Sequence, residues 1–191
     1  MWAVVPVKEF AGAKQRLSPV LAAADRARLY ALMLDRVLDA LAAARGIDGI
    51  LVVTNEARLQ RRDVRVVADL ERAGQSAAVT QGARLLAAEG HDSMLTVPGD
   101  LPLATAAEIE QVIAEHDRFT IVPSRDGKGT NALAVSPPDL IRFQFGDASF
   151  VPHCAAARAL GLEPRILRLP GLGLDVDTPD DLALYRGFAP A

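Results

Sequence analysis

The chain has 191 residues, a length that fits one domain with a sizeable hydrophobic core. Hydrophobic residues make up 50% of the chain and charged residues 24%, and the formal net charge is -3. This balance argues against a general basic surface, and we therefore expect no nucleic-acid partner.

The sequence also argues against a secreted or membrane-bound protein. Cys154 is the only cysteine, which excludes an internal disulfide and a thiolate zinc cluster and makes a reducing cytoplasm the expected location. No apolar run reaches the roughly eighteen residues of a membrane helix. Residues 1–7 lack the basic start and the length of a signal peptide, so we expect a soluble, unprocessed chain with no membrane partner.

Short apolar runs recur along the chain and predict β-strands, several of them buried on both faces, at residues 3–7, 51–53, 64–67, 93–97, 119–122, 132–135 and 165–169. Segments with a helical spacing of apolar residues lie between them, at residues 25–44, 77–89, 106–115 and 151–160. This alternation predicts an α/β fold in which helices cover both faces of a mostly parallel sheet and ligands bind at the carboxyl ends of the strands. Residues 187–191 are interpreted as a loose tail.

The loop after the first predicted strand carries three cations, Lys8, Lys14 and Arg16, together with Gly12. Lysine supplies a point charge and arginine a fork of donors, and both suit the oxygens of a triphosphate. The alternative is that these are solvated surface cations, the usual fate of lysine and arginine. Their position directly after the first strand favours nucleotide binding.

Gly74 and Ser76 precede the second predicted helix. A glycine turn that opens onto a helix N-terminus can approach a base or a ribose closely, so both residues are candidates for nucleotide binding. The competing interpretation is that Ser76 only caps the helix with its hydroxyl. The sequence does not choose between the two.

One acid, Asp100, lies on a glycine turn directly after an apolar strand, in the motif VPGDLPL at residues 97–103. Gly99 would let the backbone turn so that Asp100 projects beyond the carboxyl edge of the sheet, where it could bind a divalent cation. Glycine and aspartate are also common in plain surface turns. The motif alone leaves both interpretations open.

Two later segments could bind an anion. Residues 126–131, with the sequence DGKGTN, could cradle a small anionic acceptor with backbone N–H groups, or form a hairpin-like surface turn. They are not a Walker loop, because the GxxxxGK[ST] spacing is missing. Gly146 and Ser149 lead into the fourth predicted helix and could hold a phosphate at its N-terminus, unless Ser149 is simply the helix cap.

Near the C-terminus, Asp175 and Asp177 point to the same side of an extended backbone. Two like charges on one side are unfavourable without a cation, which favours a metal site. Thr178 is a suitable N-cap for a helix that begins at Pro179. The two acids that follow complement the helix dipole and need no catalytic role: Asp180 and Asp181. If the fold brings the N-terminal cations to this segment, an anion site and a metal site adjoin.

The histidines are poor candidates for catalysis. His91 and His116 lie near predicted helix ends, and His153 cannot share a helical face with the neighbouring Cys154. We interpret all three histidines as structural or solvated. The sequence contains no arrangement of nucleophile, base and orienting residue, which argues against a Ser/His/Asp hydrolase.

The chain contains, in this order, the motifs VPVKEFAGAKQRLSP, VPGDLPL, DGKGTNAL, FGDASF and LGLDVDTPDDL. Together they resemble the phospholactate guanylyltransferase family of deazaflavin coenzyme (F-420) biosynthesis, over nearly the whole chain. The resemblance implies a single nucleotidyltransferase domain over residues 1–191, with the Rossmann-like three-layer GT-A fold of the molybdenum-cofactor-guanylyltransferase (MobA-like) group. That wider group typically opens with a glycine-rich LAGG loop, which residues 5–8 replace here, as in the phospholactate branch.

The resemblance implies that GMP from GTP is joined to a small phosphorylated carboxylic acid, with release of pyrophosphate. The acceptor would be 2-phospho-L-lactate, phosphoenolpyruvate or 3-phospho-D-glycerate. By motif match, the acceptor site comprises Thr130, Gly146 and Ser149, the Mg²⁺ site Asp100, Asp175 and Asp177, and the nucleotide loop Lys8, Lys14 and Arg16. The three cations and Asp100 form the expected catalytic set, and which of the two late acids binds the metal directly is left open.

The residue inventory agrees with this chemistry. An acceptor phosphate has a second pKa of roughly 6, so it needs charge neutralisation and alignment rather than a general base. One rival is a related enzyme that uses a molybdopterin or sugar-phosphate acceptor, although 5% aromatic residues is low for a wide pocket. Another rival is a regulator that binds Mg-GTP without turnover, against which the two acidic segments argue. The sequence leaves open the acceptor, the side chain that reads guanine, and the oligomeric state, a homodimer included.

Overall fold

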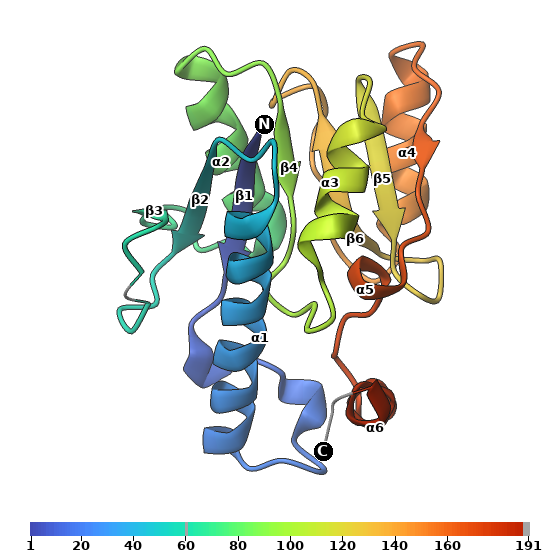
Figure 1. Ribbon diagram of the computed structural model, residues 1–191. Helices are drawn as coiled ribbons and strands as arrows, with labels where there is room; N and C mark the ends of the chain where they lie inside the picture. Colours follow the sequence, from blue (N-terminus) through green and yellow to red (C-terminus); the bar gives the residue numbers. More distant parts are fainter. Residues whose placement is uncertain (60, 189–191) are drawn as a thin grey trace.

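The computed structural model describes residues 1–59 and 61–188, which form a seven-stranded sheet in the order β3-β2-β1-β4-β6-β5-β7 (Figure 1). The strands are β1 (Trp2–Val7), β2 (Gly49–Thr54), β3 (Arg65–Val67), β4 (Met94–Thr96), β5 (Phe119–Pro123), β6 (Thr130–Val135) and β7 (Arg165–Ile166). β6 runs antiparallel to both of its neighbours, and the other pairings are parallel. The prediction of a mostly parallel sheet is confirmed.

The helices are α1 (Ala23–Ala43), α2 (Gln75–Ala88), α3 (Ala106–Ala114), α4 (Phe150–Ala159), α5 (Pro170–Gly173) and α6 (Pro179–Phe188). Two short 3-10 helices, η1 (Phe10–Gly12) and η2 (Gln15–Leu17), follow β1. The helices α1, α2, α3 and α4 lie within two residues of their predicted bounds, whereas α5, η1 and η2 were not predicted. No helix in the described ranges combines the length and the apolar character needed to cross a membrane.

Two predicted bounds are wrong. The last strand ends at Ile166. Leu167 N still donates a hydrogen bond to the Ile121 carbonyl of β5, but the strand pairing stops there, and Leu167 and Leu169 are buried before Pro170 begins α5. Gly187 and Phe188 belong to α6 and not to a loose tail. The remaining residues of that predicted tail, 189–191, lie outside the described ranges.

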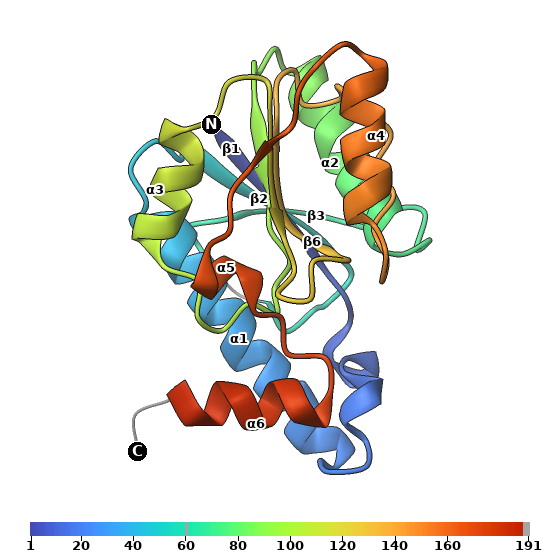
Figure 2. The same ribbon diagram turned by 90° about the vertical axis from the view of Figure 1, so that its right-hand side faces the viewer.

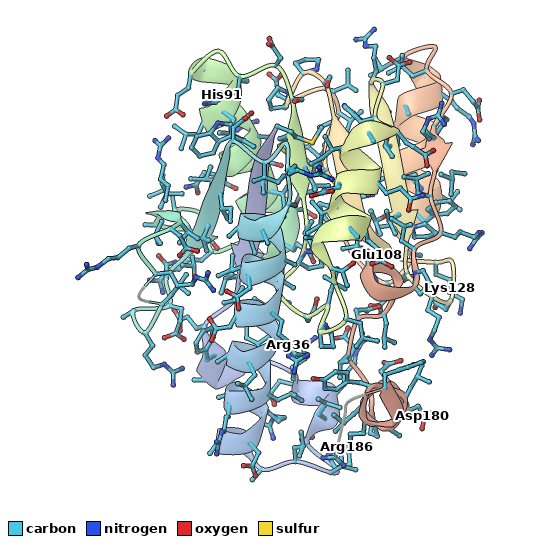
Figure 3. All side chains as sticks on the ribbon, in the orientation of Figure 1. Arg36, His91, Glu108, Lys128, Asp180 and Arg186 are labelled. Carbon is cyan, nitrogen blue, oxygen red and sulfur yellow. The ribbon has the colours of Figure 1, made fainter. Side chains whose placement is uncertain are left out.

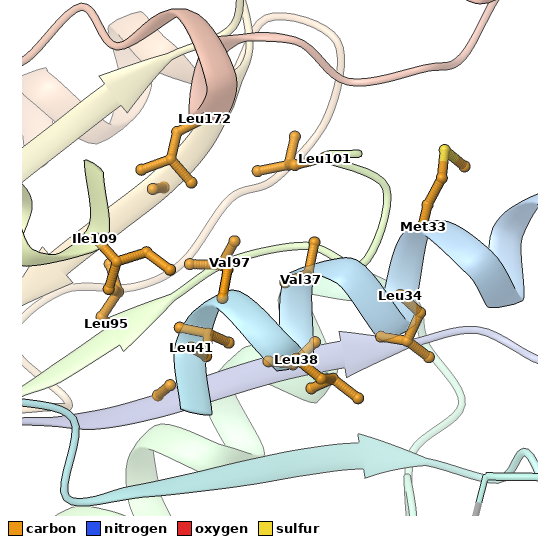
Figure 4. Close-up of a cluster of buried hydrophobic side chains, with 14 of the residues drawn as sticks. Met33, Leu34, Val37, Leu38, Leu41, Leu95, Val97, Leu101, Ile109 and Leu172 are labelled. Atoms are coloured by element: carbon orange, nitrogen blue, oxygen red, sulfur yellow. The ribbon is translucent and has the colours of Figure 1, made fainter. Parts of the chain in front are cut away.

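Helices cover both faces of the sheet, as predicted (Figure 2). α1, α3 and α5 contribute to one hydrophobic cluster, and α2 and α4 to another on the opposite face. On α1, buried apolar residues recur at helical spacing and pack toward β4 and the loop that follows it (Figure 4): Leu34, Val37, Leu38 and Leu41. Burial of a leucine side chain contributes roughly 2 kcal/mol, so this stripe fixes α1 on the sheet.

The fold brings several chain segments to one edge of the sheet. Adjacent parallel strands β1 and β4 both end there, and β5 ends there too. Because β6 is antiparallel, its first residue, Thr130, lies at the same edge. α6 crosses beyond this edge, below the sheet in Figures 1 and 2. Ligands of parallel α/β sheets bind at such an edge.

Candidate active site

A cleft of about 810 Å³ opens at the carboxyl edge of the sheet. Its lining comes from the loop after β1, the start of α2, the loop after β4, the β5–β6 loop, the residues before α4 and the segment before α6. Lys128 and Asp180 line this cleft, and Figure 3 shows both far from His91, which lies at the opposite end of the molecule. Every sequence-predicted site residue except Ser76 lines the cleft.

Lys14 lies at the centre of a cluster of charges. Its Nζ is 2.5 Å from Asp100 Oδ2 and 2.7 Å from Asp177 Oδ1, and its side chain is only 4% exposed. Burial lowers the pKa of Lys14, but the two carboxylates outweigh burial and hold that pKa above its usual value. Lys14 is therefore charged at neutral pH, and the N-terminal cations and C-terminal acids adjoin as predicted.

The loop that carries Lys14 is anchored by its apolar residues. Phe10, Ala13 and Leu17 are buried in the core beside α1, so the intervening residues cannot leave the sheet edge. Lys14 itself has a φ of 55°, in the left-handed region that non-glycine residues rarely occupy. Strain of this kind persists where surrounding contacts over-determine the backbone, which here are the two ion pairs.

The other two predicted cations are more exposed. Arg16 Nη2 lies 2.8 Å from Asp147 Oδ2, and its Nη1 lies 4.0 Å from Asp177 Oδ2. The hydrogen bond with Asp147 raises the pKa of the Arg16 guanidinium. Lys8 lines the cleft and is exposed. Arg16 and Lys8 are therefore accessible to a ligand, whereas Lys14 is enclosed by carboxylates.

Asp100 projects into the cleft from the loop after β4. Its Oδ1 is buried and has no hydrogen-bond partner among the described residues. The chain turns at Gly99 and Asp100 as predicted, although Gly99 does not have a positive φ. A Cβ on Gly99 would instead lie 2.8 Å from Leu34 Cδ1 and 3.3 Å from the Tyr30 hydroxyl, so glycine lets this loop pack closely against α1.

The late acids lie beside Asp100. The backbone N–H of Val176 donates to the Asp100 carbonyl at 3.2 Å, which joins the two acidic segments directly. Asp175 Oδ1 accepts a hydrogen bond from Asn131 Nδ2 at 3.2 Å. Burial, followed by the charge of Asp100, raises the pKa of Asp175. Within residues 1–59 and 61–188, no three carboxylate, imidazole or thiol side chains are arranged to hold a metal ion, and Lys14 Nζ contacts two of the three predicted acids.

The start of α6 confirms the interpretation of Thr178. Its backbone N–H donates to Asp181 Oδ2 at 2.9 Å, and its hydroxyl oxygen lies 3.3 Å from the backbone nitrogen of Asp181. This reciprocal pair is a capping box, so Asp181 stabilises the helix N-terminus. α6 begins at Pro179, as predicted.

A clamp on α3 holds the segment before Asp175. The Glu108 carboxylate accepts hydrogen bonds from the backbone N–H groups of Gly171 and Leu172, each at 2.8 Å. A Cβ on Gly171 would collide with the Leu103 carbonyl oxygen and with Glu108, so only glycine fits. Sequence reasoning missed this clamp, because nothing in the local pattern around Glu108 pairs it with a segment more than 60 residues away.

Thr130, Gly146 and Ser149 all line the cleft. Ser149 occupies the N-cap position of α4, but its side chain makes no capping hydrogen bond, so its hydroxyl does not cap the helix. Its Oγ is buried and without a partner in the described part of the chain. A buried hydroxyl that the protein does not satisfy is available to a ligand.

The hairpin-turn interpretation of residues 126–131 is confirmed, whereas the anion cradle stays a prediction. Residues 126–129 lie in the loop between the antiparallel strands β5 and β6, where the Ser124 hydroxyl accepts from Gly129 N at 2.7 Å, and residues 130–131 begin β6. The same loop lines the cleft. The Lys128 carbonyl accepts from Phe150 N at 2.8 Å, which ties the loop to the first turn of α4. The hairpin is therefore a wall of the cleft.

Gly74 is the N-cap of α2, lines the cleft and has a φ of 89°, which favours glycine. Ser76 is not the cap, so that alternative is wrong. Its hydroxyl oxygen accepts a hydrogen bond from the Phe145 backbone at 2.8 Å, and Ser76 is not among the residues that line the cleft. Ser76 thus connects α2 to the loop that contains Gly146.

His153 is a site-adjacent residue that sequence reasoning missed. It is fully buried, and its Nδ1 lies 3.0 Å from Thr130 Oγ1. The available signal was its position four residues after Ser149, which places both on one face of a helix. The structural interpretation of His116 is confirmed by its bonds to Thr120 and Ser136, and His91 packs on the Trp2 ring at 5.0 Å.

Burial lowers the pKa of His153 from 6.5 to about 4, which predicts a dependence of stability on pH. Between these values the unfolded chain binds the proton and the folded chain does not. The stabilisation is therefore fully present above pH 6.5 and is lost as the pH falls toward 4, by about 3 kcal/mol for this group. Urea unfolding at several pH values gives the free energy of unfolding as a function of pH. Between pH 4 and 6.5 this free energy should change less steeply with pH for His153→Asn than for wild type, and an equal pH dependence would contradict the prediction.

A family model described as "Guanylyl transferase CofC like" matches residues 1–185 of the chain. The chain is 40% identical to phosphoenolpyruvate guanylyltransferase of Sphaerobacter thermophilus, over 98% of this chain and 93% of that protein. It is 35% identical to 2-phospho-L-lactate guanylyltransferase of Methanosarcina acetivorans, covering 100% and 89%. It is 36% identical to 3-phospho-D-glycerate guanylyltransferase of Phenylobacterium zucineum, covering 94% and 86%.

A solved structure supports the fold assignment. It is titled a putative nucleotide-diphospho-sugar transferase from Desulfovibrio desulfuricans and matches with a TM-score of 0.78 at 22% identity, covering 100% of this chain and 88% of that one. At this identity the match shows the fold alone, a Rossmann-like nucleotidyltransferase sheet with helices on both faces. The nearly full-length sequence matches carry the assignment further: the chain belongs to the CofC-like guanylyl transferase family.

Proposed function

We propose that this protein transfers GMP from GTP to a small phosphorylated carboxylic acid and releases pyrophosphate, as a step of deazaflavin coenzyme biosynthesis. The observation that carries the proposal is the cluster of Asp100, Lys14 and Asp177, which lies in one cleft with the free hydroxyl of Ser149. Relatives that match almost the whole chain are named guanylyltransferases of three such acids. Fold and site thus favour an enzyme over a regulator.

The cleft divides into two ends in this proposal. Lys8 and Arg16 approach the triphosphate of GTP from the loop after β1, and Gly74 lets the nucleotide approach the N-terminus of α2. Thr130, Gly146 and Ser149 bind the acceptor on the side of β6 and α4. Ser76 supports the acceptor end through its hydrogen bond to Phe145.

The reaction forms a bond between an acceptor phosphate oxygen and the α-phosphorus of GTP, and it breaks the bond from that phosphorus to pyrophosphate. An acceptor phosphate with a second pKa of roughly 6 is already a nucleophile near neutral pH, so the protein needs no general base. The exposed cations Lys8 and Arg16 offset the charge that grows on the leaving pyrophosphate. The walls of the cleft align the two anions.

The acids fit a divalent cation. Asp100 Oδ1 is buried without a partner among the residues described, and Asp175 is a carboxylate whose charged form burial disfavours. Oxygen ligands of this type suit Mg²⁺, and we propose that Asp100, Asp175 and Asp177 would hold it. Bound there, Mg²⁺ would supply charge neutralisation for the phosphates. Lys14 contributes the positive charge that the protein itself places between Asp100 and Asp177.

Pyrophosphate release tests the proposed function. The purified protein with Mg²⁺ is incubated with GTP and, separately, with phosphoenolpyruvate, 2-phospho-L-lactate or 3-phospho-D-glycerate. We expect release with at least one acid, and weaker release with ATP or CTP in place of GTP. Release with none of the acids would contradict the proposal and favour the regulator that only binds Mg-GTP. Release with a sugar phosphate alone would favour the other rival of the same fold.

Ser149→Ala should weaken acceptor binding selectively. A hydrogen bond to a charged group contributes about 1.5–3 kcal/mol, so the KM for the acceptor should rise about tenfold or more while the KM for GTP stays close to wild type. Steady-state kinetics with each substrate varied in turn measure this. Ser136→Ala is the matched control, because Ser136 bonds to His116 and is not a lining residue of the cleft. An unchanged acceptor KM in Ser149→Ala would remove Ser149 from the acceptor site.

A further inference from the structure

His153 is bonded through both of its ring nitrogens. Nε2 lies 3.0 Å from the backbone nitrogen of Gln144, and Nδ1 lies 3.0 Å from Thr130 Oγ1. A backbone N–H can only donate, so Nε2 accepts and carries no proton. A neutral imidazole then carries its single proton on Nδ1, which donates to the Thr130 hydroxyl oxygen.

The surroundings keep the imidazole in this form. The ring is 0% exposed and packs edge-on against Phe145 at 4.9 Å between ring centroids. Burial lowers its pKa to about 4, so the ring is neutral at neutral pH. A second proton on Nε2 would face the Gln144 N–H, and two donors would then oppose each other. The contacts therefore select one tautomer.

This tautomer constrains the hydroxyl of Thr130. Its oxygen accepts the hydrogen bond from His153 Nδ1–H, and in the described part of the chain that is the one hydrogen bond its side chain makes. The hydroxyl of Thr130 can therefore donate its own hydrogen bond to another oxygen. Thr130 lines the cleft together with Ser149, which precedes His153 by one helical turn and whose own hydroxyl is unpartnered within the described ranges.

We propose that His153 is a positioning residue for the acceptor, which fixes the Thr130 hydroxyl as a hydrogen-bond donor to an anionic oxygen of the phosphorylated acid. This inference rests on the proposed function. A carboxylate or phosphate oxygen has no proton to give, so it binds best to a hydroxyl whose proton already points into the cleft. His153 does not touch the acceptor and acts through Thr130.

Two conservative variants separate the two bonds of His153. The amide of His153→Asn extends about as far as Nδ1 and can still donate to Thr130. The amide of His153→Gln extends about as far as Nε2, so it keeps the bond with Gln144 and loses the one with Thr130. We expect His153→Gln to raise the acceptor KM about tenfold or more, as Thr130→Val does, with the GTP KM unchanged. His153→Asn should stay close to wild type.

The double variant Thr130→Val/His153→Gln should bind the acceptor no more weakly than Thr130→Val alone, since both changes remove one interaction. Equal effects of the asparagine and glutamine variants, or a rise in the KM of both substrates, would overturn the inference in favour of a purely structural ring. So would a Thr130→Val variant with an unchanged acceptor KM. If wild type transfers no GMP in the same assay, the proposed function fails instead.

The tautomer can be measured without turnover or variants. A ¹⁵N NMR spectrum of the imidazole groups of the full chain, recorded near neutral pH without substrate, should show His153 with a protonated Nδ1 and an unprotonated Nε2. A protonated Nε2 would overturn the inference even if no variant folds. The spectrum therefore tests the role of His153 independently of the proposed reaction.

Discussion

Asp100→Asn is expected to leave the fold intact and to reduce turnover by roughly two or more orders of magnitude, the scale seen when a main electrostatic group of a site is lost. The change keeps the shape of the side chain and removes its charge. Asp100 forms an ion pair with Lys14, and its buried Oδ1 has no hydrogen-bond partner among the described residues. Both the ion pair and the proposed binding of Mg²⁺ depend on the charge of Asp100. Pyrophosphate release measures turnover, and thermal unfolding with circular dichroism measures the fold.

Asp180→Asn is the matched control. Asp180 also lines the cleft and is exposed, but it lies in the first turn of α6 and contributes only to the helix dipole. Its turnover should remain near that of wild type. If Asp100→Asn is equally active, Asp100 has no part in the mechanism. If both variants lose activity to the same degree, the effect reflects the total negative charge of the cleft.

Lys14→Met should lose both activity and stability. Methionine has a similar length and meets the same strain at φ 55°, so the change removes the charge and little else. Asp100 then loses its ion pair with Lys14, and Asp177 keeps only the more distant guanidinium of Arg16, at 4.0 Å. Their side chains keep 21% and 41% exposure, so water screens part of the repulsion and we expect a loss of about 2 kcal/mol, less than for a fully buried pair. Turnover should fall by roughly two orders of magnitude.

Magnesium makes the Lys14 prediction more specific. A divalent cation held by the same acids would offset the missing charge, so added Mg²⁺ should raise the Tm of Lys14→Met more than the Tm of wild type. Arg158→Met is the control for the loss of an ion pair, because Arg158 pairs with Glu163 on the surface and such pairs contribute little. A Lys14→Met protein with unchanged Tm and turnover would show that the ion pairs have no function.

The sheet and its long helices could be predicted because hydrophobic periodicity is local information. The direction of β6 could not, since a run of apolar residues reads the same in a parallel and an antiparallel strand. The turn residues at 126–131 indicated a hairpin, but they do not say which strand β6 pairs with next. In the structure β6 lies between β5 and β4, and this insertion places Thr130 at the edge where the cleft opens.

The candidate site was predictable as a set of residues, but the pairing within it was not. Lys14 stands 86 residues from Asp100 and 163 from Asp177 in the sequence, so only the fold decides that they form ion pairs. His153 was interpreted as structural or solvated because the sequence allows only its neighbours on the same helix to be considered. Its partners are Thr130 on a strand and the backbone of Gln144 in a loop. Long-range hydrogen bonds of this kind leave no periodic signal.

The Glu108 clamp has a consequence for the acids that we propose bind Mg²⁺. Glu108 holds the chain at Gly171, and the hydrogen bond from Val176 to Asp100 holds it again next to Asp175 and Asp177. The segment that carries the acids is thus tethered before Asp175, at Gly171, and again between Asp175 and Asp177, at Val176, before any ligand binds. A cation that binds there has only side-chain rotamers to order, because the backbone is preorganised. Glu108 lies on α3 and does not line the cleft, yet by fixing this backbone it increases the affinity with which the acids would bind a cation.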